Sequence, residues 1–245
     1  MQKFFISLEE FEALSLPKDV TYQIKNVLRG QVSDQFLLGV EPKTYLAEIT
    51  EIGNKEIKFR VVKEMAGNFE LPVFVSLFQG YPKGDKLESI IKYGTQLGIS
   101  EIHPTLMTRS VFKLDPQKKE NKLERLNKIA KEAAEQSFRN IVPRVKDIEN
   151  LKNIDFKEYS IKLLCYEESA KKGEESAFKK AIQGLSFNDR IAVVVGPEGG
   201  ITPEEACYLE SQGFVKVGLG PRIMRTETVI YYILSAISYE WELGR

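Results

Sequence analysis

The sequence VVVGPEGGITPEE, Val193–Glu205, holds an apolar strand, a glycine-rich turn and the start of a helix. After one further helix and strand, the sequence LGPRIMRTET, Leu219–Thr228, shows the same order of strand end, glycine turn and helix start. In open α/β sheets, ligands bind in the crevice outside the carboxyl ends of the strands, and glycine lets a backbone approach a ligand closely. The two loops are therefore predicted to lie side by side and to hold one flat ligand through their backbone groups.

These loops do not match the common nucleotide-binding fingerprints. Neither G-x-G-x-x-G nor G-x-x-x-x-G-K-[ST] occurs in the chain, which disfavours an NAD or ATP site. Pro197 fixes its own backbone angle, Thr202 is a suitable N-cap, and Pro203 stands where helices tolerate proline. The simpler alternative is an ordinary strand–turn–helix connection whose glycines serve only the turn.

Bulk composition limits the class of protein. The chain has 245 residues, 42% of them apolar, which suits one large or two small domains. Cys165 and Cys207 form no C-x-x-C pair, and the single histidine, His103, cannot supply a His-rich metal site. Neither a signal peptide nor an apolar run of membrane-spanning length is apparent. We expect a cytoplasmic protein with no metal and no membrane partner.

The net charge of zero hides an uneven distribution along the chain. Residues 73–146 hold 14 Lys/Arg against 8 Asp/Glu, a balance of +6. Residues 1–72 balance at −2 and residues 147–245 at −4. The basic middle is a candidate phosphate-contacting surface, with a solvated lysine-rich helix face as the alternative.

The first 70 residues are predicted to form a small β-rich domain. Many short strands with turn signals suggest a small barrel, and Gly53–Lys55 is expected to be a hairpin turn because Gly and Asn tolerate positive φ. The expected strands are 3–7, 35–40, 44–52 and 56–63, and the expected helix is 18–28.

From residue 71 onward, apolar strands alternate with amphipathic helices. This alternation predicts a parallel α/β sheet. Strands are expected at 73–78, 101–104, 161–166, 190–195 and 214–218, and helices at 87–97, 117–138, 173–183, 203–212 and 226–241.

The two glycine loops, GPEGGIT-x-E and LG-x-R-I-x-R-x-ET, resemble the cofactor loops of the SPOUT methyltransferases, and among these the RsmE-type enzymes are most similar. Four further segments fit in the same order: Val27–Arg29, Pro82–Glu88, Gly94–Ile99 and Glu132–Asn140. The resemblance spans nearly the whole chain. Two departures are Tyr22–Asn26, where the family often has a His pair, and Val229, where many relatives have a small residue.

The resemblance implies a fold. It implies a knotted SPOUT α/β domain with a parallel sheet at residues 71–245, with a C-terminal trefoil knot, and a PUA-like, RNA-binding β-barrel at residues 1–70. Knots are rare, and periodicity does not predict one. This expectation therefore rests on the resemblance alone.

The resemblance also implies S-adenosylmethionine as the cofactor. The loop backbones are expected to hold it, and the end of the preceding strand is expected to form a third wall. The implied cofactor-binding residues are Leu164, Cys165, Gly196, Pro197, Glu198, Gly199, Gly200, Ile201, Leu219, Gly220, Ile223, Met224, Arg225 and Thr228.

Two of these residues are candidates for catalysis. Arg225 directly precedes a helix, an unfavourable position for a cation because helix N-termini attract anions. Such a misfit hints at function, namely binding of a phosphate or of the uracil edge. The alternative is an ion pair with Glu227 or Glu198. Glu198 is a candidate general base, or a partner that holds Arg225 in place.

Further residues are candidates for RNA contacts. Glu135 and Arg139 are four positions apart and are alternatively a simple helix pair, and any single lysine is alternatively a solvated charge. The candidates are Arg29, Lys83, Lys86, Arg109, Lys113, Glu135, Gln136, Arg139 and Arg222.

The resemblance implies methylation of N3 of a specific uridine in the decoding region of 16S ribosomal RNA, within the assembled small subunit. It also implies a homodimer, with the last helix in the interface; the alternative is that the apolar stripe of this helix is intramolecular core. Two other functions remain open. One is a SPOUT methyltransferase for another RNA, such as a transfer RNA ribose or guanine, and the other is a catalytically inactive RNA-binding assembly factor.

Overall fold

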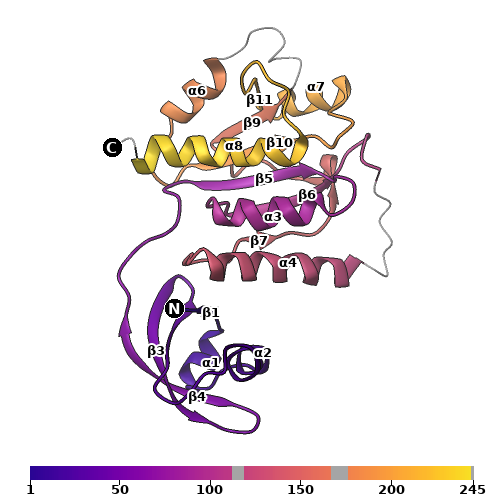
Figure 1. Cartoon of the computed structure of the whole chain (residues 1–245). Helices are drawn as coiled ribbons and strands as arrows, with labels where there is room; N and C mark the ends of the chain where they lie inside the picture. The colour runs from indigo at the N-terminus through magenta and orange to yellow at the C-terminus, as the bar shows by residue number, and fades with distance from the viewer. Residues whose placement is uncertain (112–118, 167–175, 244–245) are drawn as a thin grey trace. The chain divides into compact units, whose positions relative to one another are not determined.

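The computed structural model of the chain describes residues 1–111, 119–166 and 176–243 (Figure 1). Backbone contacts divide the chain into two compact units. The first unit comprises Met1–Glu70 and Ala134–Val142, and the second comprises Leu71–Ala133 and Pro143–Arg245. The grouping of Ala134–Val142 with the first 70 residues was not expected from the sequence.

Residues 1–70 form a four-stranded mixed sheet in the order β1-β2-β3-β4. Strand β1 runs parallel to β2, and the remaining neighbours are antiparallel. The apolar core includes Phe4, Phe36, Leu38, Ile49 and Phe59. The elements are β1 (Lys3–Phe5), α1 (Leu8–Glu12), α2 (Lys18–Tyr22), the π-helix η1 (Gln23–Leu28), β2 (Gln35–Val40), β3 (Lys43–Ile52) and β4 (Ile57–Glu64).

The β3–β4 hairpin forms where it was predicted, but for a different reason. The Gly53 amide donates to the Glu56 carbonyl at 2.9 Å, and neither Gly53 nor Asn54 has a positive φ. A Cβ on Gly53 would lie 3.2 Å from that carbonyl, so close backbone approach favours glycine here. The prediction that this turn uses positive φ is therefore wrong.

Within the described part of the second unit, seven strands form one parallel sheet in the order β11-β9-β10-β5-β6-β7, with β8 also paired to β6. This confirms the predicted parallel α/β sheet. The strands are β5 (Phe74–Gly80), β6 (Glu101–Leu106), β7 (Arg144–Val145), β8 (Glu149–Asn150), β9 (Ile161–Cys165), β10 (Arg190–Val195) and β11 (Val215–Val217).

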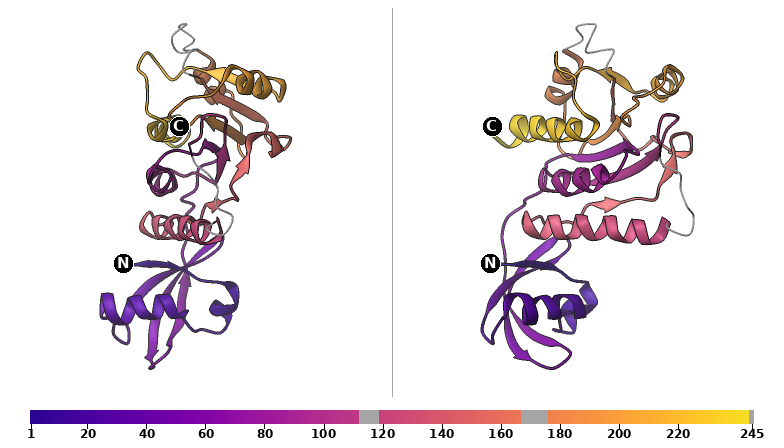
Figure 2. Two further views of the ribbon diagram at one scale, coloured as in Figure 1. Left: turned by 90° about the vertical axis from the view of Figure 1, so that its right-hand side faces the viewer. Right: turned by 45° about the vertical axis from the view of Figure 1, so that its right-hand side comes forward.

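Helices cover both faces of this sheet. Helices α3 and α8 lie side by side on one face, and α7 lies on the other (Figures 1 and 2). Side chains alternate along a strand, so Ala192 and Val194 of β10 both pack toward α7, in a cluster with its Ala206 and Leu209. The helical elements are α3 (Lys86–Gln96), α4 (Lys119–Gln136), η3 (Leu151–Asn153), α6 (Ser176–Gln183), α7 (Pro203–Ser211), α8 (Thr226–Ser238) and η4 (Tyr239–Leu243).

Two helices end two residues away from the expected bounds. Helix α4 ends at Gln136, not at residue 138, and Phe138 takes a left-handed backbone with φ of 59°, which no helix can continue through. The last helix continues as η4, where the Trp241 indole donates to the Ile182 carbonyl at 3.1 Å. None of the described helices is long and apolar enough to cross a membrane.

Candidate cofactor cavity at the carboxyl ends of the strands

Three adjacent strands of the second unit end level with one another. Cys165 of β9 is in register with Val195 of β10 and with Val217 of β11. These strand ends, together with the loops that follow β10 and β11, line a cavity of about 520 Å³. Cavities of a few hundred Å³ at this edge of an α/β sheet commonly bind small ligands. The two glycine loops therefore do meet, as predicted.

Most of the predicted cofactor-binding residues line this cavity. Leu164 does not, because its side chain is buried in the core against α7. Gly220 and Thr228 are not among the lining residues either; Thr228 is exposed in the first turn of α8. The predicted residues that line the cavity are Cys165, Gly196, Pro197, Glu198, Gly199, Gly200, Ile201, Leu219, Ile223, Met224 and Arg225.

The cavity also contains residues that the sequence reasoning missed. All of them lie within a few positions of predicted residues, at the strand ends, in the loop before α8 or in its first turn, so extending each motif by a few positions would have found them. They are Tyr166, Val195, Val217, Pro221, Thr226, Glu227 and Val229.

The first loop is shaped by glycines that leave no room for a side chain. A Cβ on Gly80, at the end of β5, would lie 2.4 Å from Pro197 Cδ and 2.5 Å from the Pro197 nitrogen. A Cβ on Gly196 would lie 2.8 Å from Ile201, and Gly200 has a φ of +75°. Close approach and positive φ both favour glycine, so the sequence specifies the course of this loop.

A buried polar network ties this loop to the start of α8. The Thr226 hydroxyl donates to the Gly196 carbonyl at 2.6 Å. The Gln79 amide group donates to Thr226 Oγ1 at 2.8 Å and to the Gly80 carbonyl at 3.0 Å. Three chain segments are thereby held at fixed spacing on one side of the cavity. The Gln79 Oε1 atom is buried and has no hydrogen-bond partner.

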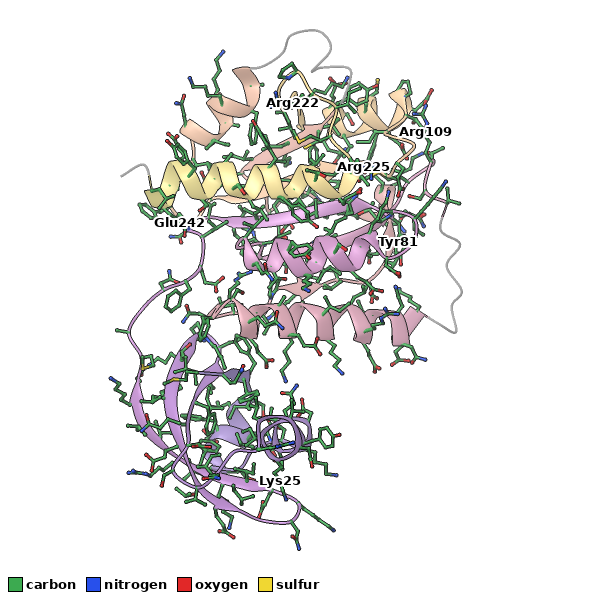
Figure 3. All side chains as sticks on the ribbon, viewed as in Figure 1. Lys25, Tyr81, Arg109, Arg222, Arg225 and Glu242 are labelled. Carbon is green, nitrogen blue, oxygen red and sulfur yellow. The ribbon has the colours of Figure 1, made fainter. Side chains whose placement is uncertain are left out.

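Arg109 supports the other side of the same loop. Its guanidinium Nη1 donates to the Gly199 carbonyl at 2.8 Å, and a Cβ on Gly199 would lie 2.9 Å from Arg109 Cβ. Arg109 therefore has a positioning contact in addition to its exposed position at the cavity. Figure 3 shows Arg109, Arg222 and Arg225 gathered at the end of the second unit away from Glu242.

Two carboxylates and one lysine face the cavity. Lys86 Nζ lies 2.7 Å from Glu198 Oε1 and 3.7 Å from Glu227 Oε2. The backbone N–H of Lys83 donates to Glu198 at 3.1 and 3.2 Å. Desolvation acts to raise the pKa of Glu198, but hydrogen bonds from Lys86 and the backbone lower it overall. Glu198 is thus held as a carboxylate by Lys86.

Arg225 has different surroundings. It is the N-cap residue of α8 and its side chain makes no capping hydrogen bond. Within the described residues, no hydrogen bond or ion pair joins its guanidinium to Glu198, to Glu227 or to any other side chain. The ion pair considered as the simpler alternative is therefore not formed.

The third wall of the cavity is uncharged. Burial raises the pKa of the Cys165 thiol to about 12, so the thiol is protonated at neutral pH. Together with Val195, Val217 and Ile201, it makes an apolar surface, beside the backbone groups of the glycine loop. Apolar walls with a few polar groups suit a flat, partly polar cofactor.

The predicted RNA contacts fall into separate places. Lys86, Arg109 and Arg222 line the cavity. Lys83 does not, but its backbone N–H donates to Glu198, which does. Arg29 belongs to the first unit and has a positive φ of 55°. Lys113 lies outside the described residues.

The Glu135–Arg139 segment belongs to the first unit, and its charged groups already have protein partners. Arg139 is 3% exposed and its guanidinium pairs with Glu70. Glu135 accepts a hydrogen bond from the Phe5 amide at 2.9 Å, and Gln136 is the last residue of α4. A buried, paired guanidinium is not available to an RNA phosphate, so we withdraw Arg139 as an RNA contact.

The sequence of this chain was compared with protein-family models and with known proteins. A family model for an RNA methyltransferase domain matches residues 69–238. Ribosomal RNA small subunit methyltransferase E of Bacillus subtilis is 42% identical over 256 residues, covering 100% of this chain and 99% of the relative.

Two solved structures contain the expected cofactor. Ribosomal RNA small subunit methyltransferase E from Neisseria gonorrhoeae, bound to S-adenosylmethionine, has a TM-score of 0.82 at 25% identity and covers 98% of both chains. A Legionella pneumophila protein in complex with the same cofactor has a TM-score of 0.78 at 27% identity, covering 92% of this chain and 90% of the other.

The parallel α/β domain with its two glycine loops is thus that of the RNA methyltransferases. The similarity to the Bacillus subtilis relative over the full length of both chains identifies the family within this class. The chain belongs to the ribosomal RNA small subunit methyltransferase E family. The family and the α/β fold with a separate N-terminal β domain, both predicted from the sequence, are confirmed.

Proposed function

We propose that this protein uses S-adenosylmethionine to methylate N3 of a uridine in the RNA of the small ribosomal subunit. The observation that carries the proposal is the cavity between the two glycine loops, in a chain 42% identical to a relative named as a small-subunit ribosomal RNA methyltransferase. The proposed substrate is an unpaired uridine of the decoding region, presented by the assembled subunit.

The cavity suits the cofactor by its shape and chemistry. The glycine loop presents backbone groups close to the ligand space, and Leu219, Ile223 and Met224 supply apolar contacts from the second loop. When bound, the cofactor supplies an electrophilic methyl group on a sulfonium. The role of the loops is to fix the orientation of the methyl group relative to the incoming base.

The substrate must lose a proton for N3 to react. Neutral uracil carries hydrogen on N3. A base must accept this proton, which leaves negative charge shared with O2 and O4. The N3–CH₃ bond would then form as the bond between the methyl group and the sulfonium sulfur breaks. The unpaired guanidinium of Arg225 is suited to stabilise that charge. Glu198 is a weaker candidate for the base, because its lowered pKa makes it a poor proton acceptor.

Recognition of the RNA follows from the position of N3 on the pairing edge. The uridine has to be unpaired or turned out of its helix before N3 reaches the cavity. Arg109 and Arg222 are exposed at the cavity and are proposed phosphate contacts. The homodimer, the trefoil knot and the RNA-binding role of the first unit remain predictions of the resemblance; light scattering in solution tests the dimer.

The proposed function is tested by deleting the gene and digesting the 16S ribosomal RNA to nucleosides. Mass spectrometry is expected to show loss of 3-methyluridine, restored by the wild-type gene and not by Arg225→Ala. An unchanged 3-methyluridine content contradicts the proposal. Loss of a different methylated nucleoside would instead identify another RNA substrate, and no change in any nucleoside would favour a non-catalytic assembly factor.

A further inference from the structure

Arg225 should pair with a carboxylate, and it does not. Glu227 is two residues along the chain from Arg225, and Glu198 lines the same cavity. An arginine fork binds carboxylates strongly, through two parallel hydrogen bonds. Among the described residues, however, it is Lys86 that contacts both carboxylates, at 2.7 Å from Glu198 and 3.7 Å from Glu227.

Lys86 is well placed for this contact. It is the first residue of α3, and its side chain extends to the loop after β10 and to the first turn of α8. Glu198 is also fixed from a second side, because both of its carboxylate oxygens accept from the Lys83 backbone N–H. The pKa of Lys86 is raised, mainly by the hydrogen bond to Glu198, while the positive charge of Arg225 acts in the opposite direction. Lys86 and Arg225 both line the cavity that holds these two carboxylates.

Glu227 is the less satisfied of the two carboxylates. Its Oε2 atom is buried without a hydrogen bond, and the Lys86 ammonium at 3.7 Å is its one ion pair within the described residues. Without Lys86, two carboxylates with a net charge of −2 would face an unpaired guanidinium in the same cavity. Such a guanidinium would be expected to turn onto them.

From this arrangement we infer that Lys86 is a positioning residue that occupies Glu198 and Glu227 and thereby keeps the Arg225 guanidinium free for the negative charge of the reacting base. Lys86 acts through Arg225 and does not itself touch the reacting atoms. This inference deepens the proposed function and rests on it. It also changes the expectation from the sequence, in which Lys86 was an RNA contact.

The test compares Lys86→Met with Lys86→Arg. Lys86→Met is expected to lower kcat at saturating RNA and cofactor by about 10- to 100-fold. Its dissociation constant for S-adenosylmethionine, measured by calorimetry, is expected to change by less than about threefold, since backbone groups hold the cofactor. Lys86→Arg keeps the charge and is expected to retain most of the rate. Lys92→Met, on an exposed lysine of the same helix, is the matched control and is expected to match the wild type.

A double-mutant cycle separates positioning from a general structural role. In a background of Glu198→Gln and Glu227→Gln, there is no carboxylate to capture Arg225, so Lys86→Met is expected to cost less than about threefold in kcat. A phosphate contact would instead raise KM for the RNA and reduce the salt dependence of binding in both backgrounds.

A crystal structure of Lys86→Met gives a readout independent of catalysis. Arg225 is expected within hydrogen-bond distance of Glu198 or Glu227. The inference is overturned if Arg225 keeps its position, if kcat is unchanged, or if the loss is equal in both backgrounds. Failure of the proposed function gives a different result, because the wild-type protein would then form no 3-methyluridine. The position of Arg225 in the crystal structure of Lys86→Met does not depend on that outcome.

Discussion

Arg225 at the cavity and Arg139 in the first unit carry the same guanidinium in opposite surroundings. Arg139 is 3% exposed, its guanidinium pairs with Glu70, and its backbone carbonyl accepts a hydrogen bond from Lys3 Nζ at 2.5 Å. Arg225 is exposed at the cavity, and no described side chain pairs with it. In the first unit the guanidinium is paired with a carboxylate, whereas at the cavity the guanidinium has no described carboxylate partner.

Structural and functional charges differ in whether the protein itself supplies a partner. A buried ion must be paired, because an unpaired charge out of water costs several kcal/mol. An ion at a water-filled cavity can remain unpaired, and its interactions are then available to a ligand. The residue type alone could not assign either arginine, since both were candidates for RNA contacts or catalysis. The presence or absence of a carboxylate partner in the structure distinguishes them.

The largest expected effect is on the structural side of this comparison. Arg139→Ala removes the partner of Glu70, whose side chain is 16% exposed, and is expected to destabilise the first unit by about 3–5 kcal/mol. Urea unfolding followed by circular dichroism measures this. Adding Glu70→Ala should recover part of the loss, because no unpaired charge then remains. A stability loss below about 1 kcal/mol would contradict the structural role.

On the functional side, Arg225→Ala is expected to lower the methylation rate by about 100- to 1,000-fold. Its thermal unfolding midpoint should stay near the wild-type value, because the side chain has no described partner to lose. Single-turnover kinetics with small ribosomal subunits measures the rate. A large fall in stability with little change in the methylation rate would contradict the functional role and indicate a structural role for Arg225.

The cavity can also be tested through its backbone, without altering a charge. Gly80→Ala places a Cβ about 2.4 Å from Pro197 Cδ and is expected to weaken cofactor binding by about 1–3 kcal/mol, or roughly 5- to 150-fold. Gly94→Ala, where the nearest atom to the new Cβ is 3.6 Å away, is the control in α3. Equal cofactor affinities for the two variants would show that the Pro197 loop moves freely.

The smallest effect concerns Glu101, a paired charge in the second unit. It contacts Lys146 at 3.1 Å and His103 at 3.3 Å. Burial acts to raise the pKa of Glu101, but these two partners lower it from 4.5 to about 2. A carboxylate whose pKa is lower in the folded state contributes stability above its unfolded pKa and loses it as the pH falls through the folded pKa.

The wild type is therefore expected to be about 1–2 kcal/mol more stable than Glu101→Gln at pH 7. This advantage should shrink as the pH falls from about 4.5 toward 2. Urea unfolding of both proteins at several pH values measures it. If the stability difference between the wild type and Glu101→Gln did not change with pH, the glutamine would destabilise the protein for a reason other than lost charge, such as poorer packing.

Much of the fold could be predicted because its signals are local. The continuous apolar runs of β5 and β10, and the periodic stripes of α3 and α8, identify these elements within a few residues. Helix α1 was missed, although Ser7 and Glu10 form a capping box that marks its start. Its five residues are too few to show a periodic pattern.

The cavity was only partly predictable, because its charges depend on contacts distant in sequence. The glycine loops carry their own backbone requirement, so Gly196 and Gly200 could be selected from the sequence. The contacts of Glu198 with Lys86, and of Thr226 with Gln79, join residues more than a hundred positions apart. No spacing rule finds such pairs, and each pair has consequences for which side chains remain available.

The single tryptophan of the chain is a natural optical probe. Trp241 donates its indole N–H to the Ile182 carbonyl at 3.1 Å and packs edge-on against Phe187 at 5.6 Å. Its emission therefore reports whether the C-terminal segment is docked against the residues around α6. The first unit contains no tryptophan, so indole emission follows the unfolding of the second unit alone, while far-ultraviolet circular dichroism follows both. Comparing the two signals in one titration would reveal in which order the units unfold.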